Sequence, residues 1–420
     1  MNDVVGVSVA PGEGHLRGSA GYRRIMAAMV CAGMVTFVLL YDTQALLPAF
    51  HDAFDVTPAG ATLSMSLTTA GLALGLLVAG PASEVLGRTR LIVGAVWLAS
   101  LVALLCPFAW SWHALLALRF VQGVVLAGLP AVATAYLREE LHGSAQARAA
   151  GVYIGGTALG GMMGRLLTAP ITDLLDWRWG LGAAALLSLG CALAVTMMLP
   201  PSRNFRGRRR QDLALGAMSR AALGDPALRR LYLLGGCAVG ALVVVFNALG
   251  FRLVGAPHHI SLGAISLLYL VYPLGTISAS VSGAWADRLG RRAVLPIGCV
   301  LAVFGVALTI SSSLVAIVIG LACLTMGFFV AHGIASGWVV VRAHAAGASA
   351  SQAAAFYLCA YYIGSSVFGS LGSSAWSSYG WAGPAALALG LLVVVGILSL
   401  NLRHIPAIVP ARAETRPAAA

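Results

Sequence analysis

The sequence predicts an all-α membrane protein with twelve transmembrane helices in two related six-helix halves. Only 10% of the 420 residues are charged and 59% are hydrophobic, whereas soluble domains carry about 25% charged residues. Long apolar stretches recur along the whole chain, and motifs of the first half return about 204 residues later. A water-soluble fold could not bury so much apolar surface, so the bilayer is the expected solvent.

The apolar stretches are long enough to cross a membrane, because a transmembrane helix needs about 20 mostly apolar residues. The first half has spans near residues 25–48, 59–80, 91–110, 113–137, 147–171 and 179–199. The second half has spans near residues 231–252, 262–283, 293–312, 313–337, 350–374 and 383–402.

The loops between the spans alternate in charge. All 26 basic residues are arginines, and on one side of the predicted membrane the loops contain only Arg178 and Arg252. Because positively charged loops stay in the cytoplasm, we predict a multi-pass protein of a bacterial inner membrane with both termini cytoplasmic. The predicted parts are an N-terminal tail (1–21), a first bundle (22–200), an Arg-rich linker (201–230), a second bundle (231–404) and a C-terminal tail (405–420).

The predicted linker is strongly basic. Its charge could attract anionic lipid headgroups or serve regulation, but we favour a plain cytoplasmic linker that follows the positive-inside rule. Its charged residues are Arg203, Arg206, Arg208, Arg209, Arg210, Asp212, Arg220, Asp225, Arg229 and Arg230.

Two predicted cytoplasmic loops share a pattern of glycine, acidic and basic residues, which suits tight turns and gating contacts. The loop after the second span contains Gly80, Glu84, Gly87, Arg88 and Arg90. The loop after the eighth span contains Gly283, Asp287, Arg288, Gly290, Arg291 and Arg292. Because six spans separate the two copies, the halves are predicted to be parallel repeats about an axis along the membrane normal.

The loop from Gly283 to Arg292 resembles the G-x-x-x-D-R-x-G-R-R loop of the major facilitator superfamily (MFS). The run from Arg119 to Gly123 resembles that family's R-x-x-Q-G motif. The resemblance covers residues 22–404. It implies the MFS fold, with two parallel six-helix bundles related by pseudo-two-fold symmetry, a cytoplasmic latch at the two loops, and proton coupling through the fourth span.

Three charged residues lie inside the predicted spans, where charges are costly and usually functional. Counting 1.5 Å per residue from the span ends places Asp42, Arg119 and Arg165 in one layer of the first half. We interpret Asp42 as a proton carrier whose charge depends on its distance from the arginines. The alternative is a fixed structural salt bridge. His332 is either a second proton site or a neutral packing residue.

The aligned second-half positions carry no charge. Asn247, Cys323 and Gly369 stand where the first half has Asp42, Arg119 and Arg165. We therefore expect polar and aromatic residues near mid-span to bind the substrate, since tyrosine offers an apolar face and one hydroxyl. The candidates are Tyr41, Gln44, Gln122, Tyr153, Asn247, Tyr269, Tyr272, Tyr357, Tyr361 and Tyr362.

The fifth span carries a ridge of glycines, at Gly151, Gly155, Gly156, Gly160, Gly161 and Gly164. Such a ridge permits either sliding of helices or close static packing. It resembles the G-x-x-x-G-P-x-x-G-G motif of drug/proton antiporters, although the proline is missing. With the stretch from Tyr41 to Pro48, it resembles the efflux-type branch of the superfamily, particularly YnfM-like permeases. We therefore expect a secondary active transporter that exports drug-like or sugar-like compounds in exchange for protons by alternating access. The missing proline leaves proton-coupled uptake of a small metabolite as the alternative.

Other classes of protein lack their characteristic residues. The single carboxylate within the spans argues against a membrane-embedded enzyme, and the linker is too short for a sensor's output domain. Nothing resembles a nucleotide-binding P-loop, a metal site or a disulfide framework. We expect no cofactor other than the proton gradient as energy source, no nucleic acid, and a monomer whose partners are a small-molecule substrate, protons and lipid.

Overall fold

A computed structural model of the chain describes residues 14–205 and 215–404. The remaining residues of the predicted tails, and Arg206, Arg208, Arg209, Arg210 and Asp212 of the linker, lie outside this part. Within the first half, residues 14–205, the helices are α1 (Ala20–Tyr41), η1 (Gln44–Leu46), α2 (Leu47–Phe54), α3 (Pro58–Leu86), α4 (Arg88–Leu105), η2 (Cys106–Phe108), α5 (Trp112–Leu126), α6 (Ala133–Glu140), α7 (Gly143–Leu174) and α8 (Trp177–Met198).

The second half, residues 215–404, has corresponding long helices after one short additional helix, although the short elements between them differ. Its elements are α9 (Leu215–Gly224), α10 (Pro226–Val254), α11 (Leu262–Ser266), η4 (Leu267–Val271), α12 (Tyr272–Leu289), α13 (Arg291–Leu308), α14 (Leu314–Ala345), α15 (Ala350–Tyr379) and α16 (Ala382–Arg403).

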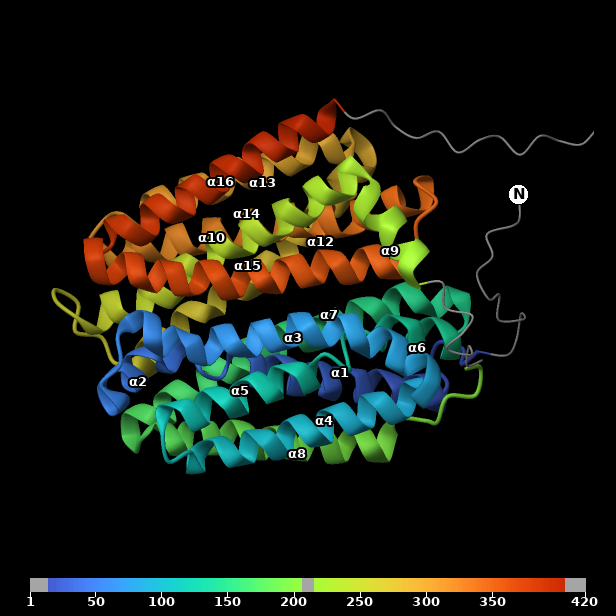
Figure 1. The fold of residues 1–420 in the computed structure, drawn as a ribbon, viewed down its shortest axis with the longest axis horizontal. Helices are drawn as coiled ribbons and strands as arrows, with labels where there is room; N and C mark the ends of the chain where they lie inside the picture. The colour runs from blue at the N-terminus through green and yellow to red at the C-terminus, as the bar shows by residue number, and fades with distance from the viewer. Residues whose placement is uncertain (1–13, 206–214, 405–420) are drawn as a thin grey trace, which may run out of the picture.

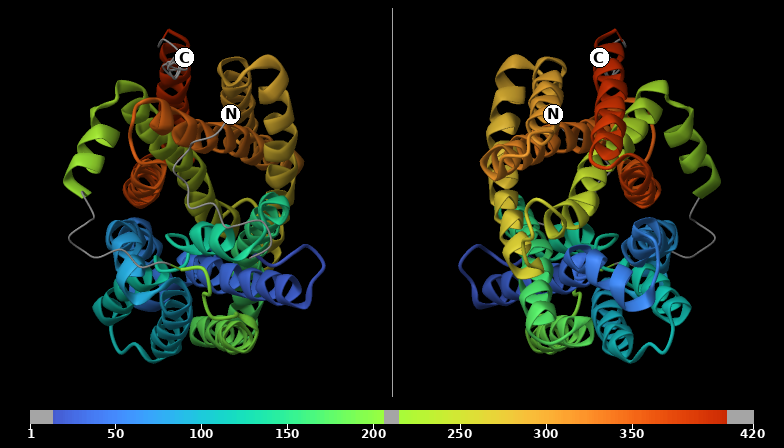
Figure 2. Two further views of the ribbon diagram at one scale, coloured as in Figure 1. Left: turned by 90° about the vertical axis from the view of Figure 1, so that its right-hand side faces the viewer. Right: turned by 90° about the vertical axis from the view of Figure 1, so that its left-hand side faces the viewer.

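The two halves form two bundles that lie side by side (Figures 1 and 2). Corresponding helices match in length, with 18 residues in both α4 and α13 and 22 in both α8 and α16. The turns before α4 and α13 each use a glycine in the positive-φ region, Gly87 at 89° and Gly290 at 85°, which side chains other than glycine rarely adopt. The repeat seen in the sequence is therefore also a repeat of backbone geometry.

The predicted all-α membrane fold is confirmed. Ten segments of the described chain are long and apolar enough to cross a membrane. The other two predicted spans correspond to α7 and to α5 with α6. Large apolar side chains face outward, for example Val78, Val300 and Val315, each more than 60% exposed. A lipid environment accounts for such exposure along continuous helices.

We call the end of the molecule where α1 begins and α16 finishes the terminal end, and the opposite end, where α2 lies, the distal end (Figure 1). The hydrogen bonds that the structure describes between the halves lie in the middle and the distal part of the helices. The bonds join Gln44 to Asn247, Thr62 to Ser373, Ser66 to Ser366 and Ser370, Arg165 to Tyr272, and Asp173 to the N–H groups of Leu262 and Gly263.

Two spans of the first half differ from the prediction. The first span was expected to finish at Pro48, but α1 finishes at Tyr41 and the chain continues through η1 and α2. The fourth span is interrupted between α5 and α6 by residues 127–132. Pro130 lies in this interruption, and proline cannot donate the hydrogen bond that a continuous helix requires.

The second half shows two further differences. The eighth span divides into α11, η4 and α12 just before Pro273, again where a backbone donor is missing. The predicted linker contains the helix α9, and α10 begins at Pro226, before the expected boundary. Asp225 caps α10 by accepting from the N–H groups of Ala227 and Leu228, each at 2.9 Å.

Candidate functional site

A buried ion pair lies in the distal part of the first half. Arg119 Nη1 of α5 lies 3.0 Å from Asp42 Oδ1 at the C-terminus of α1, and the side chains are 1% and 3% exposed. This oxygen accepts no hydrogen bond in the described structure, so charge rather than aligned hydrogen bonding holds the pair together.

Neutral oxygens surround the rest of the Arg119 guanidinium. It donates to Gln122 Oε1 at 2.6 Å and to the carbonyl oxygens of Leu39 at 3.0 Å and Ser64 at 3.1 Å. The arginine thus joins α1, α3 and α5. Gln122, predicted to contact substrate, is fully buried next to Arg119.

Arg165 lies apart from this pair. The sequence suggested that two arginines serve Asp42, but Arg165 of α7 donates through Nε to Gln44 Oε1 at 2.7 Å and through Nη1 to the Gly161 carbonyl at 2.6 Å. Among the described ion pairs, Asp42 pairs only with Arg119. Depth counting placed the three charges in one layer but could not give the rotation of each helix about its axis.

Gln44 connects Arg165 to the second half. Its Nε2 donates to Asn247 Oδ1 of α10 at 2.7 Å, while Asn247 Nδ2 has no partner among the described atoms. Tyr41, Tyr269 and Tyr272 place their rings against Arg165, with centroids 4.1, 4.5 and 4.7 Å from its Cζ. Five of the predicted substrate residues thus gather with Arg165 at one contact between the halves: Tyr41, Gln44, Asn247, Tyr269 and Tyr272.

Of the other predicted tyrosines, Tyr361 borders this group through a side-chain hydrogen bond with Tyr41. Tyr357 shares a hydrogen bond of 2.9 Å with His332 Nδ1, and the ring of Tyr361 lies 5.0 Å from the His332 ring. Tyr153 lies in the buried core of the first half, which Tyr362 of α15 also enters. His332 is thus hydrogen-bonded and packed among aromatic rings.

The two predicted gating loops differ in structure. Arg88 lies 2.6 Å from Glu84 and 3.0 Å from Glu139, and it also bonds Ser83. In the second loop Asp287 and Arg288 are exposed, with no ion pair described for either. Of the other members, Arg90 and Gly283 are exposed, and Gly80 and Arg291 are half-buried. Arg292 donates to the Arg403 carbonyl at 3.1 Å.

The ion pairs of two acidic residues near the terminal end, Glu139 and Asp225, were not predicted from the sequence. Glu139 pairs with Arg88, and burial raises its pKa against the opposing hydrogen bonds from Arg88. Asp225 lies 2.7 Å from Arg342 at the end of α14. Acidic residues are rare on this arginine-rich side of the chain, and that rarity could have marked both residues as candidates for ion pairs. It gave no indication of which arginine each acid would meet.

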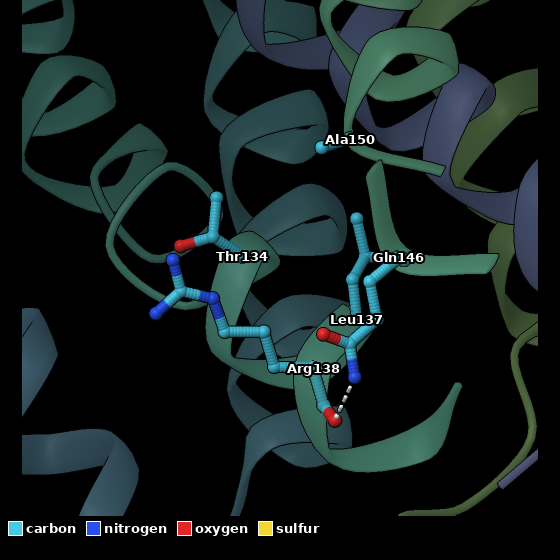
Figure 3. Close-up of a pocket in the computed structure, with 5 residues that line it drawn as sticks. All are labelled: Thr134, Leu137, Arg138, Gln146 and Ala150. Carbon is cyan, nitrogen blue, oxygen red and sulfur yellow. Dashed lines mark hydrogen bonds between the residues drawn. The ribbon is translucent and has the colours of Figure 1, made fainter. Parts of the chain in front are cut away.

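A cavity of about 250 Å³ lies near the terminal end, between α6 and α7 (Figure 3). Thr134, Leu137, Arg138, Gln146 and Ala150 line it, and Gln146 donates to the Arg138 carbonyl at 3.0 Å. No predicted site residue is among the five. The buried ion pair and the Arg165 group are therefore the stronger candidates for a functional site.

Known proteins resemble this chain along most of its length. The family model of the Major Facilitator Superfamily matches residues 25–254. The inner membrane transport protein YnfM of Escherichia coli (strain K12) is 39% identical over 388 residues, covering 92% of both chains. The "uncharacterized MFS-type transporter YybF" of Bacillus subtilis (strain 168) is 37% identical, covering 91% of this chain and 94% of its own.

The fold also matches solved structures. A bacterial homologue of the human lysosomal transporter Spinster, inward-facing and occupied, superposes with a TM-score of 0.70 at 16% identity, covering 92% of this chain and 97% of its own. At this identity the comparison speaks for the fold alone.

Proposed function

Because the chain belongs to the major facilitator superfamily and is thus a secondary transporter of small solutes, we propose that it exports its solute in exchange for protons. The observation that carries the proposal is the buried pair of Asp42 and Arg119. A buried ion pair adds little net stability, and an ionisable group inside a membrane span usually serves transport. Asp42 is the proton carrier in this proposal, and the proton gradient is the energy source.

The turn after α1 offers a route from protonation to movement. When Asp42 takes up a proton, Arg119 loses its counter-charge and keeps only neutral acceptors. Gln44 follows two residues later and holds both Arg165 and Asn247 of the other half. A shift of this turn would thus act directly on a contact between the halves, as coupling through contiguous groups requires.

The terminal end is cytoplasmic in this proposal, because the arginines of the loops gather there. The described contacts between the halves then close the outer side. The halves rock about the site, so that it opens to each side in turn. The protein works as a monomer in a bacterial inner membrane.

The test uses efflux-deficient bacterial cells that produce wild type, Asp42→Asn or Asp52→Asn at matched membrane levels. Asp52 is an exposed acid of α2 and serves as the control. A panel of labelled drugs, dyes, sugars and organic acids is followed with and without a protonophore. Wild type and Asp52→Asn are expected to exclude at least one compound while the gradient persists, and Asp42→Asn to exclude none. Exclusion that survives in Asp42→Asn would refute coupling through Asp42, and gradient-dependent accumulation would reverse the proposed direction.

A further inference from the structure

Arg165 is a buried cation without a buried anion. Its side chain is fully buried, and the four ion pairs found among the described residues do not include it. Arg119, buried at a similar depth, has Asp42 beside it. The contact region between the halves therefore carries one uncompensated positive charge.

The groups around Arg165 solvate this charge without cancelling it. Tyr41 comes from the first half and Tyr269 and Tyr272 from the second, and their ring faces attract a cation. The Gly161 carbonyl accepts from Nη1. Burying an unpaired charge remains costly even when dipoles surround it, so a carboxylate arriving here would gain a strong partner.

Gln44 occupies the edge of the guanidinium that a carboxylate would take. Both Nε and Nη2 donate to its Oε1, and these parallel donors form the fork that binds carboxylates in a bidentate manner. Gln44 is held by Asn247 from the other half. If the halves part at the distal end, Gln44 loses this anchor and Arg165 loses two of its three rings.

We infer that Arg165 binds the carboxylate of the transported solute, and that the substrates are small organic carboxylates with an apolar or aromatic body. The inference rests on the proposed transport function. It predicts that the substrate is negatively charged. The pair of Asp42 and Arg119 makes no such prediction, because its two charges cancel. The tyrosine rings around Arg165 favour an apolar body next to the carboxylate.

Binding to the purified protein tests this inference without a proton gradient. Benzoate, phenylacetate and hexanoate are each compared with their amides at pH 7.5, by ligand-induced thermal stabilisation. Wild type is expected to prefer at least one acid over its amide. Arg165→Gln should lower the affinity for that acid by about 10- to 100-fold, which corresponds to the loss of a charged hydrogen bond. It should leave the affinity for the amide unchanged. Arg165→Lys, which keeps the charge but loses the fork, should fall between.

Arg252→Gln is the matched control. Arg252 also lies at the distal end, with its Cζ 4.4 Å from the Trp381 ring, and it donates to the carbonyls of Thr309 and Ser311. It has the same kind of partners as Arg165 but lies within the second half. Its loss should not change the preference for acids.

Gln44→Glu tests the inference with Arg165 intact, in case Arg165→Gln does not fold. The new carboxylate should pair with Arg165, and the unused Nδ2 of Asn247 can turn to donate to it. We expect a raised melting temperature and loss of acid binding. Equal binding of every acid and its amide to wild type would overturn the inference, as would acid preference in Gln44→Glu or in folded Arg165→Gln. Because no gradient is used, these results are independent of the transport test on Asp42.

Discussion

Arg119 and Arg165 are both fully buried, but they meet different partners. Asp42 compensates the charge of Arg119 at 3.0 Å, and removing one member of such a pair typically costs about 3–5 kcal/mol. Arg165 relies on Gln44, a backbone carbonyl and three tyrosine rings. The first arrangement suits a proton that is exchanged within one half, and the second suits a ligand held between two halves.

Asp225 allows a prediction about pH. Burial alone would raise its pKa, but hydrogen bonds from Arg342 and from the first N–H groups of α10 outweigh burial, so the pKa is lowered in the folded protein. Ionised Asp225 therefore stabilises the folded protein at any pH above the pKa of aspartate in the unfolded chain, about 4. This stabilisation is lost as the pH falls through the lower pKa that Asp225 has in the folded protein.

Asp225→Asn isolates the charge, because asparagine caps a helix about as well as aspartate. At pH 7 we expect the variant to be less stable than wild type by about 1–3 kcal/mol in free energy of unfolding. Its melting temperature should be correspondingly lower. The difference should shrink as the pH falls below about 4. Thermal unfolding of the purified protein from pH 3 to 8 checks this, with Asp52→Asn as an exposed control. A difference that does not vary with pH would contradict the assigned role of charge.

For single residues, the sequence predicted the depth in the membrane better than the partners of each side chain. Counting along the spans brought Asp42 and Arg119 to one level, and they do meet. It could not predict that Arg165 turns to Gln44, because a rotation of one helix by a single residue position, about 100°, redirects a side chain without changing its depth. The ion pairs of Glu139 and Asp225 were not predicted, because the partners are distant in the sequence.

The glycine ridge of α7 packs directly on the backbone of α1. A Cβ added at Gly156 would lie 2.8 Å from Val30 Cα, and one added at Gly160 would lie 2.7 Å from Met34 Cα. Contacts this short leave room only for hydrogen, so both positions need glycine. Both helices belong to the first half, and the contact therefore favours static packing over sliding between halves.

Gly160→Ala is expected to destabilise the protein by about 1–3 kcal/mol, the usual cost of overpacking, because the obstructing atoms are backbone. Gly155→Ala on the same helix is the control, since nothing lies within 4 Å of the added Cβ. Removing a helical glycine there should be neutral or stabilise by up to about 1 kcal/mol. Melting temperatures of the two purified variants, each compared with wild type, test this prediction. Equal stability of both would show that α1 and α7 do not pack this closely.

Breaks within helices were the least predictable features of the elements. Apolar composition located the fourth and eighth spans, but not the interruption at 127–132 or the short η4. Prolines are tolerated in transmembrane helices because neighbouring groups satisfy the freed carbonyls. A proline in an apolar run therefore does not by itself show that the helix is broken. The break at η4 lies where Tyr269 and Tyr272 meet Arg165.

The whole molecule is described in one of its states. The repeated loops predicted two parallel halves, and the structure confirms this architecture. The sequence could not predict which end is closed, because the alternative states of a transporter differ by only a few kcal/mol. The described hydrogen bonds between the halves lie in the middle and the distal part of the helices, so this state is closed at the distal end.

Locking the distal end tests the proposed rocking of the halves. Thr62 Oγ1 of α3 and Ser373 Oγ of α15 lie 2.6 Å apart, close enough for cysteines at both positions to form a disulfide. In a background without the seven native cysteines, oxidised Thr62→Cys/Ser373→Cys should lose transport of any compound moved by wild type. Reduction should restore it, and each single cysteine variant should be insensitive to oxidant. Binding from the terminal end should persist in the locked protein, since no described bond there joins the halves. Full transport by protein shown to be cross-linked would mean that the distal contacts never open, and that alternating access through this interface is wrong.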